Sequence, residues 1–377
     1  MRGWLTIRRA TRCKGSDVQQ ASRYESGRPV GRLSAGRVVA RVFGVLLTIV
    51  VALALTVVGV CFLLLRGPSG NARDLVVTTM LESDTLSALP KVFLTDPQIQ
   101  DILARVAMAP IDPSELDPSL IDTSEALNPD GIEIYEVERP TFSGRVLVVS
   151  DPSRVRVATT KPFGDEGAKL TQIVAESTAV GGVNGGLVDG GRGKGGYPSG
   201  AVVSRGEIIW LDTSKSGLFL VGLTEDNILR FEDIRGMTDH QVEKLVEDKR
   251  IRDGVCMSEE TAELTMSFCP LIVNGVSRET DGAGSGENAR TVIGQRADGA
   301  ILLFVCDGSI LSGRAGATAS DITSIMLEYG AVNAANLCGG SMSGMVYGDI
   351  TLDPLELVTF GAADEARIPT AFVVDSR

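Results

Sequence analysis

Histidine is almost absent from this 377-residue sequence, in which His240 is the only one. An H-E-x-x-H zinc motif is therefore excluded, and a serine–histidine hydrolase would have to use His240. That residue lies beside a helix-start pattern, Thr238 with Gln241 three positions later, where a solvated surface position is expected. The sequence thus offers little support for either class of hydrolase.

Cysteine is scarce as well, and no C-x-x-C pair occurs among the six. Cys13 and Cys61 lie in the first sixty-odd residues, and the other four are Cys256, Cys269, Cys306 and Cys338. Without paired cysteines or a second histidine, a zinc site of the usual nitrogen and sulfur kind is not predicted. No cofactor is predicted either, and a divalent cation remains compatible with the sequence.

Tryptophan occurs twice, and Trp210 is the only one beyond the N-terminal region. A long sugar-binding cleft lined with stacked aromatic rings is therefore not predicted.

One long apolar segment is present, since Val42–Leu65 contains 24 residues without a charge or a proline. At about 1.5 Å per residue such a helix spans the roughly 30 Å bilayer core. A cleaved signal peptide is the alternative, but its apolar region is typically ~7–15 residues long. This segment is longer, begins some forty residues into the chain and is followed by no A-x-A site. We therefore predict a single transmembrane helix at residues 42–65.

Charge is distributed unevenly about this segment. Residues 1–41 contain ten Lys/Arg against Asp17 and Glu25, a net charge of +8, so the rest of the chain carries −12 − 8 = −20. The positive-inside rule predicts a cytoplasmic tail at residues 1–41 and an acidic domain outside the cell membrane. A basic tail can also bind nucleic acid, but topology explains the charge without a further assumption. The acidic domain would repel phosphate backbones, so nucleic acid is not a predicted partner.

Residues 66–139 have the composition of a stalk, with prolines at 90, 97, 110, 113, 118 and 129. One helix is marked within it: Asp96 is expected to cap it and Pro97 to take its first position. A buried stripe is predicted on that helix at Ile99, Ile102, Leu103 and Val106.

From residue 140 to 377 the sequence predicts an α+β domain with a mixed or antiparallel sheet and packed helices. Short β-rich segments alternate with turns, and Asp298-Gly299 between Thr291–Gln295 and Ala300–Val305 is a strong hairpin signal. A second hairpin is expected around Gly348-Asp349. Amphipathic helices are expected at Asp239–Glu247 and between Thr318 and Gly330. No internal repeat is apparent.

Four of the expected strands begin or end in small or polar residues. These are Asn184-Gly185-Gly186 after Ala179–Val183, Arg290 before Thr291, Asp307-Gly308 after Cys306, and Cys338-Gly339-Gly340-Ser341 after Val332–Leu337. Glycine after a strand lets a ligand approach the backbone and leaves N–H groups for anions. Each alone would be an ordinary turn, but four together predict one shared site.

A glycine-rich segment, Gly190–Gly196, is similar to a phosphate-binding loop only in composition. Lys194 is followed by Gly195 rather than by Ser or Thr, and no helix pattern follows. We interpret it as a loop beside the site, whose Arg192 and Lys194 could meet an anionic substrate.

Several segments, in order, resemble the phosphodiester glycosidase family, which includes membrane-bound bacterial proteins of exopolysaccharide-biosynthesis type and the lysosomal uncovering enzyme. They are Gly182-Val183-Asn184-Gly185-Gly186, Pro198-Ser199-Gly200, Pro270–Gly275, Arg290–Gln295, Asp307-Gly308 and Gly330–Ser341. The resemblance implies hydrolysis of a sugar-1-phosphodiester, such as an N-acetylglucosamine-1-phosphodiester in a cell-envelope glycan.

The site roles follow from this chemistry, which needs a stabilised phosphate charge and a carboxylate that activates water or attacks directly. Arg290 is the predicted phosphate clamp and Asp307 the carboxylate, with Asp189 as a weaker second carboxylate. Asn184 is predicted to hold a sugar hydroxyl or a phosphate oxygen. Substrate-binding positions are predicted at Gly185, Gly186, Asn336, Cys338, Gly339, Gly340 and Ser341, with the amides of Gly339 and Gly340 assisting Arg290.

One position departs from the family. Where the family typically has N-L-D-G-G, this chain has Asn336-Leu337-Cys338-Gly339-Gly340, so cysteine replaces an acid. Two hypotheses of different class therefore stand. The first is a membrane-anchored phosphodiester glycosidase, and the second is a catalytically impaired relative that binds envelope polysaccharide or scaffolds its assembly.

Overall fold

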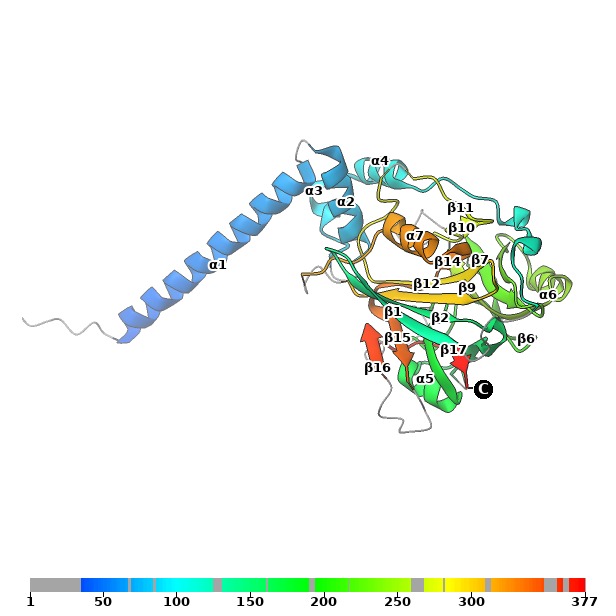
Figure 1. Cartoon of the computed structure of the whole chain (residues 1–377). Helices are drawn as coiled ribbons and strands as arrows, with labels where there is room; N and C mark the ends of the chain where they lie inside the picture. Colours follow the sequence, from blue (N-terminus) through cyan, green and yellow to red (C-terminus); the bar gives the residue numbers. More distant parts are fainter. Residues whose placement is uncertain are drawn as a thin grey trace, which may run out of the picture. The chain divides into compact units, whose positions relative to one another are not determined.

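The computed structural model describes residues 35–66, 69–83, 86–124, 131–160, 162–189, 194–215, 217–258, 268–280, 282–308, 313–348, 358–361 and 366–376 (Figure 1). The chain divides into two compact units, residues 1–60 and 61–377. The described part of the first unit is helical and belongs to α1 (Ala35–Arg66). Within α1, Val39–Arg66 is long and apolar enough to cross a membrane.

The second unit begins with three helices, α2 (Gly70–Leu81), α3 (Pro90–Phe93) and α4 (Asp96–Val106). The predicted stripe on α4 is buried as expected, and its Ile99, Ile102 and Leu103 pack against α2 and Leu65. The cap differs from the prediction. Thr95 precedes the helix and its N–H donates to Gln98 Oε1, so Asp96 is the first helical residue rather than the cap. Helix α2 was not predicted, because the glycines and the proline of residues 67–70 indicated only a break.

Two short 3-10 helices, Pro113–Glu115 and Pro118–Leu120, connect α4 to three sheets in which every paired strand is antiparallel. The first sheet has the order β1 (Ile132–Glu138), β2 (Ser143–Val149), β13 (Ile301–Cys306), β12 (Arg290–Arg296), β14 (Ala331–Asn336), β10 (Ile272–Val273) and β11 (Val276–Ser277).

The other two sheets have five strands each. One has the order β16 (Val358–Gly361), β15 (Gly344–Tyr347), β4 (Ala179–Asn184), β17 (Thr370–Asp375) and β3 (Val155–Thr159). The other has the order β6 (Glu207–Asp212), β5 (Gly200–Ser204), β9 (Ile251–Ser258), β7 (Leu218–Thr224) and β8 (Leu229–Asp233). This is the predicted α+β class, with antiparallel sheets.

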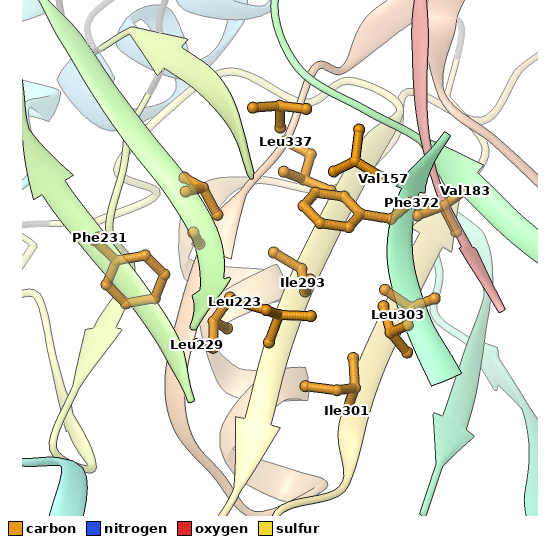
Figure 2. Close-up of a cluster of buried hydrophobic side chains, with 14 of the residues drawn as sticks. Val157, Val183, Leu223, Leu229, Phe231, Ile293, Ile301, Leu303, Leu337 and Phe372 are labelled. Carbon is orange, nitrogen blue, oxygen red and sulfur yellow. The ribbon is translucent and has the colours of Figure 1, made fainter. Parts of the chain in front are cut away.

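The main hydrophobic core brings together side chains from all three sheets (Figure 2). Ile293 and Leu303 from the first sheet, Phe372 from the second and Phe231 from the third belong to this one cluster, and all are at most 1% exposed. Alternate residues of β12 and β13, such as Val292 and Phe304, face a second cluster on the other side of the first sheet. Both faces of this sheet are thus buried at β12 and β13.

Three helices cover the outer faces. Helix α7 (Ala319–Glu328) packs on the first sheet, α5 (Leu170–Glu176) on the second and α6 (Asp239–Asp248) on the third. The capping boxes predicted for α6 and α7 are both present. The predicted hairpin at Asp298-Gly299 is confirmed by the pairing of β12 with β13. The second strand expected after Gly348 lies outside the described residues, and β15 pairs with β16.

One helix–strand unit is repeated in the fold, although no repeat was predicted from the sequence. Residues 170–184 (α5 and β4) and 322–336 (in α7, and β14) align at a constant offset of 152, since 331 − 179 and 336 − 184 are both 152. Thr178 and Gly330, before each strand, both have positive φ. The identical pairs are Thr171/Thr323, Ile173/Ile325, Glu176/Glu328, Ala179/Ala331, Val180/Val332 and Asn184/Asn336. Both copies end in an asparagine, and both asparagines lie at the predicted site.

Candidate functional site at the strand ends

Three of the four predicted strand ends meet at one edge of the first sheet. Strand β12 begins at Arg290, which pairs with Cys306 at the end of β13, and Val292 pairs with Asn336 at the end of β14. The fourth end comes from the second sheet, because Asn184 of β4 bonds to Thr291. The antiparallel register therefore gathers these segments as expected.

Asn184 holds two chain segments together. Its Nδ2 donates to the Cys338 carbonyl at 2.6 Å, and its Oδ1 accepts from Thr291 Oγ1 at 2.7 Å and from Gly344 N at 3.1 Å. The Cys338 N–H donates in return to the Gly185 carbonyl. Because Asn184 is 1% exposed, its amide fixes the position of the Cys338 turn.

Gly185 and Gly186 serve close packing. A Cβ on Gly185 would lie 2.4 Å from Thr370 Oγ1, and one on Gly186 would lie 2.7 Å from the Cys256 carbonyl. Both N–H groups are also used, since Gly185 N donates to the Thr370 carbonyl and Gly186 N to Thr370 Oγ1. In this structure neither amide is open to an anion.

The turn after β14 is the more accessible part of the site. Ser341 is exposed, and Cys338, Gly339 and Gly340 are half-buried. Gly340 has a positive φ of 64° and its N–H donates to the Ala289 carbonyl at 2.8 Å, so this amide does not assist Arg290 as predicted. A Cβ on Gly339 would lie 4.0 Å from Arg290 Cδ, which places this turn directly beside the arginine.

Arg290 is buried against Glu82, which follows helix α2. Arg290 Nη2 lies 2.5 Å from Glu82 Oε2, and both side chains are 4% exposed. Nη2 also donates to Ser285 Oγ and the Gly286 carbonyl, and Nε to the Ala317 carbonyl. The guanidinium lies over the ring of Phe268, 5.1 Å from its centre. This is a charge-assisted network in a largely dry environment.

Burial raises the pKa of Glu82, and the charge of Arg290 and the Gly286 N–H oppose that rise. Desolvation is the larger effect, as expected for a carboxyl withdrawn from water. Sequence reasoning missed Glu82 entirely, because a single acidic residue in the stalk carries no motif.

Asp307 lies at the same edge but turns toward β2. Its Oδ1 accepts from Ser143 N at 2.7 Å, and Arg314 Nη1 lies 3.8 Å from Oδ2. Within the described residues no hydrogen bond or ion pair joins Asp307 to Arg290. The next residue, Gly308, is close to β12, since a Cβ there would lie 2.5 Å from Ala289 N. With its side chain 36% exposed, Asp307 is accessible to a ligand.

Cys306 points the other way, into the core, as alternation along the strand predicts. It is fully buried in the cluster beneath α7, and burial raises the pKa of its thiol to about 12. Cys338 lies in the turn after β14, where its Sγ is 3.5 Å from Met342 Sδ. No disulfide forms between them.

Comparison with known proteins adds a finding to this geometry. The family model for phosphodiester glycosidase matches residues 177–375, which is more than half of the chain. The chain belongs to the phosphodiester glycosidase family. No curated protein sequence matches it.

Three solved structures are similar to this family member at low identity. The catalytic domain of zebrafish N-acetylglucosamine-1-phosphodiester alpha-N-acetylglucosaminidase, auto-inhibited by pro-peptide, has a TM-score of 0.49 and 17% identity, covering 68% of this chain and 87% of that one. A hypothetical protein from Synechocystis has a TM-score of 0.39 and 16% identity, and the match covers 65% of this chain and 62% of that one. A putative exported protein from Burkholderia pseudomallei has a TM-score of 0.41 and 16% identity, and the match covers 62% of this chain and 74% of that one.

Of the remaining predicted positions of this phosphodiester glycosidase family member, Asn336 lies at the gathered strand ends and the others lie elsewhere. Asn336 is 3% exposed, and its Oδ1 has no hydrogen-bond partner within the described residues. Asp189 lies 3.6 Å from Lys215 Nζ, in the segment that continues β4. Lys194 is exposed, and Arg192 lies outside the described residues. His240 is 89% exposed, as predicted for a solvated helix start. Among the described residues no group of three metal-ligating side chains is present.

Proposed function

We propose that this chain hydrolyses the bond between a sugar and the phosphate of a sugar-1-phosphodiester, such as an N-acetylglucosamine-1-phosphodiester in a cell-envelope glycan. The observation that carries the proposal is the gathering of Arg290 and the Cys338 turn at one edge of a family-matched domain. Hydrolysis of phosphodiester-linked sugars is the reaction by which the family is named.

In this proposal Arg290 contacts the phosphate and Asp307 supplies the carboxylate. Phosphate is a good leaving group, so the reaction needs charge stabilisation more than a strong general acid. The Asp307 side chain is partly exposed, with Oδ1 accepting from Ser143 N and Oδ2 facing Arg314. Asn336 offers a buried acceptor for a sugar hydroxyl, and Asn184 acts through the turn that it holds.

Substrate selectivity tests this proposal. The purified chain is given three chromogenic compounds: a sugar-1-phosphodiester, the matching simple glycoside, and a phosphodiester without a sugar. We expect release only from the first, because it alone combines an anomeric carbon with a phosphate leaving group. Release from the sugar-free phosphodiester at the same rate would show a phosphodiesterase instead.

Cys338 is the position at which the second hypothesis, a binding protein, gains support. Its thiol replaces the acid of the family motif, and its Sγ lies against Met342 Sδ. A catalytically impaired relative would keep the arginine and the turn and bind the glycan without cleaving it.

Replacing Cys338 with aspartate is therefore expected to raise hydrolysis, by roughly tenfold or more, because it restores a carboxylate at the turn. The measurement is the initial rate on one sugar-1-phosphodiester, beside Cys338→Ser as a control of similar size and no charge. A lower rate for Cys338→Asp than for the parent would mean that cysteine is the working residue here.

The proposed location is the cell membrane, with residues 1–41 in the cytoplasm and the acidic domain outside. The charge difference of +8 against −20 supports it. Protease added to intact cells is expected to degrade the domain and to spare a tag on the N-terminal tail. Digestion of the tail with protection of the domain would reverse the orientation.

A further inference from the structure

Arg290 is held through two of its three guanidinium nitrogens. Nε and Nη2 donate to the Ala317 carbonyl, Glu82, Ser285 and the Gly286 carbonyl. No hydrogen bond of Nη1 is recorded within the described part of the chain. A guanidinium offers five N–H donors in a rigid fork, and two of them are on Nη1.

The segment that carries Glu82 is interlocked with the strand that carries Arg290. Gly286 N donates to Glu82 Oε1 at 2.8 Å, Asn288 Nδ2 donates to the Glu82 carbonyl at 3.0 Å, and Glu287 N donates to Thr79 Oγ1. The backbones are in direct contact, since a Cβ on Gly286 would lie 2.5 Å from Thr79 N. The C-terminal end of helix α2 is thus packed against the segment that leads into β12, as an integral part of the domain.

A second set of contacts anchors α2 on its other side. Asp74, near its start, accepts from Arg105 of α4 at 2.8 and 3.0 Å. Val77 and Leu81 of α2 are buried in one cluster with Ile102 and Leu103 of α4. Departure of Glu82 would therefore require α2 to leave two packed surfaces and would strand a buried arginine charge.

We propose that Glu82 is a positioning residue of the active site, which holds Arg290 so that Nη1 meets the substrate phosphate. This inference rests on the proposed function. Glu82 lies 95 residues before the family-matched segment, since 177 − 82 = 95, and 16 residues after α1 ends, since 82 − 66 = 16. The site is then completed by the segment that directly follows the apolar helix.

The opposite possibility is that Glu82 occupies the place of the phosphate and blocks the site. The two hypotheses predict opposite changes in the affinity for phosphate when Glu82 is replaced. A positioning carboxylate orients Arg290, so its loss weakens phosphate binding. A blocking carboxylate competes for the same N–H groups, so its loss strengthens binding. Interlocking on both sides of α2 favours positioning.

The test compares Glu82→Gln, Glu82→Asp and the parent as full chains in lipid nanodiscs. Glu287→Gln is the matched control, because Glu287 is half-buried three residues from Arg290 and no side-chain contact to the arginine is recorded. Binding of N-acetylglucosamine 1-phosphate and of inorganic phosphate is measured by titration calorimetry. KM and kcat for a sugar-1-phosphodiester are measured on the same samples.

We expect Glu82→Gln to weaken phosphate binding at least tenfold and to raise KM, Glu82→Asp to recover part of the loss, and Glu287→Gln to stay within about twofold of the parent. Circular dichroism checks that each variant folds. If Glu82→Gln does not fold, the test rests on Glu82→Asp, which is also expected to bind phosphate more weakly than the parent. If the folded Glu82 variant binds phosphate as tightly as the parent, or more tightly, the inference is overturned. A parent that binds phosphate but turns nothing over contradicts the proposed function and leaves the binding comparison to decide the role of Glu82.

Discussion

Asp307→Asn is expected to lower the rate of sugar release about a thousandfold, which corresponds to roughly 4 kcal/mol in the activation barrier. Asparagine has nearly the same shape and keeps an oxygen that can accept from Ser143 N, so the turn should persist. What it loses is the negative charge that activates water or stabilises the sugar cation. The measurement is kcat on a sugar-1-phosphodiester.

Asp298→Asn is a suitable control for that experiment. Asp298 lies at the other end of the same β12–β13 hairpin, where it pairs with Arg296 and is also partly exposed. Its replacement should leave kcat within about twofold of the parent. Full activity in Asp307→Asn would place the working carboxylate elsewhere and would remove Asp307 from the site.

Arg290→Met is expected to destabilise the second unit by about 3–5 kcal/mol at neutral pH, because it leaves the carboxyl of Glu82 buried without its partner. The double variant Arg290→Met with Glu82→Met should recover most of this loss, since two apolar side chains replace the pair. The measurement is the midpoint of thermal unfolding of the parent, the single variant and the double variant.

The loss of stability in Arg290→Met should also depend on pH and should be larger at higher pH. The pKa of Glu82 is already raised by burial, and removing Arg290 takes away an effect that lowers it. A carboxyl with a raised folded-state pKa binds its proton more tightly in the folded state, so stability falls as pH rises above its ordinary value of 4.5. The variant should therefore lose more stability at about pH 7.5 than at about pH 5. An equal loss at both values would mean that Glu82 is not the buried charge.

The sequence predicted those features of the fold that have a local cause. The stripe on α4, the capping boxes of α6 and α7, and the Asp298-Gly299 turn each depend on residues a few positions apart. The gathering of strand ends was also predictable, because glycines and polar residues interrupt apolar strands there. Register then follows from antiparallel pairing.

The direction of individual site groups was not predictable, because it depends on contacts between distant segments. Asp307 turns toward Ser143, 164 positions away, and Arg290 pairs with Glu82, 208 positions away. The amides of Gly185 and Gly186 look available in the sequence but donate to Thr370. The repeat of the α5–β4 unit in α7–β14 was missed because its matches are scattered over two different elements.

The most direct measurement of the central claim is the rate at which the full-length chain releases sugar from a sugar-1-phosphodiester, compared with Asp307→Asn prepared in the same way. Our account predicts steady turnover by the parent and about a thousandfold less by the variant. Saturable binding of the same compound without turnover by the parent would contradict it and would show a glycan-binding relative of the phosphodiester glycosidases.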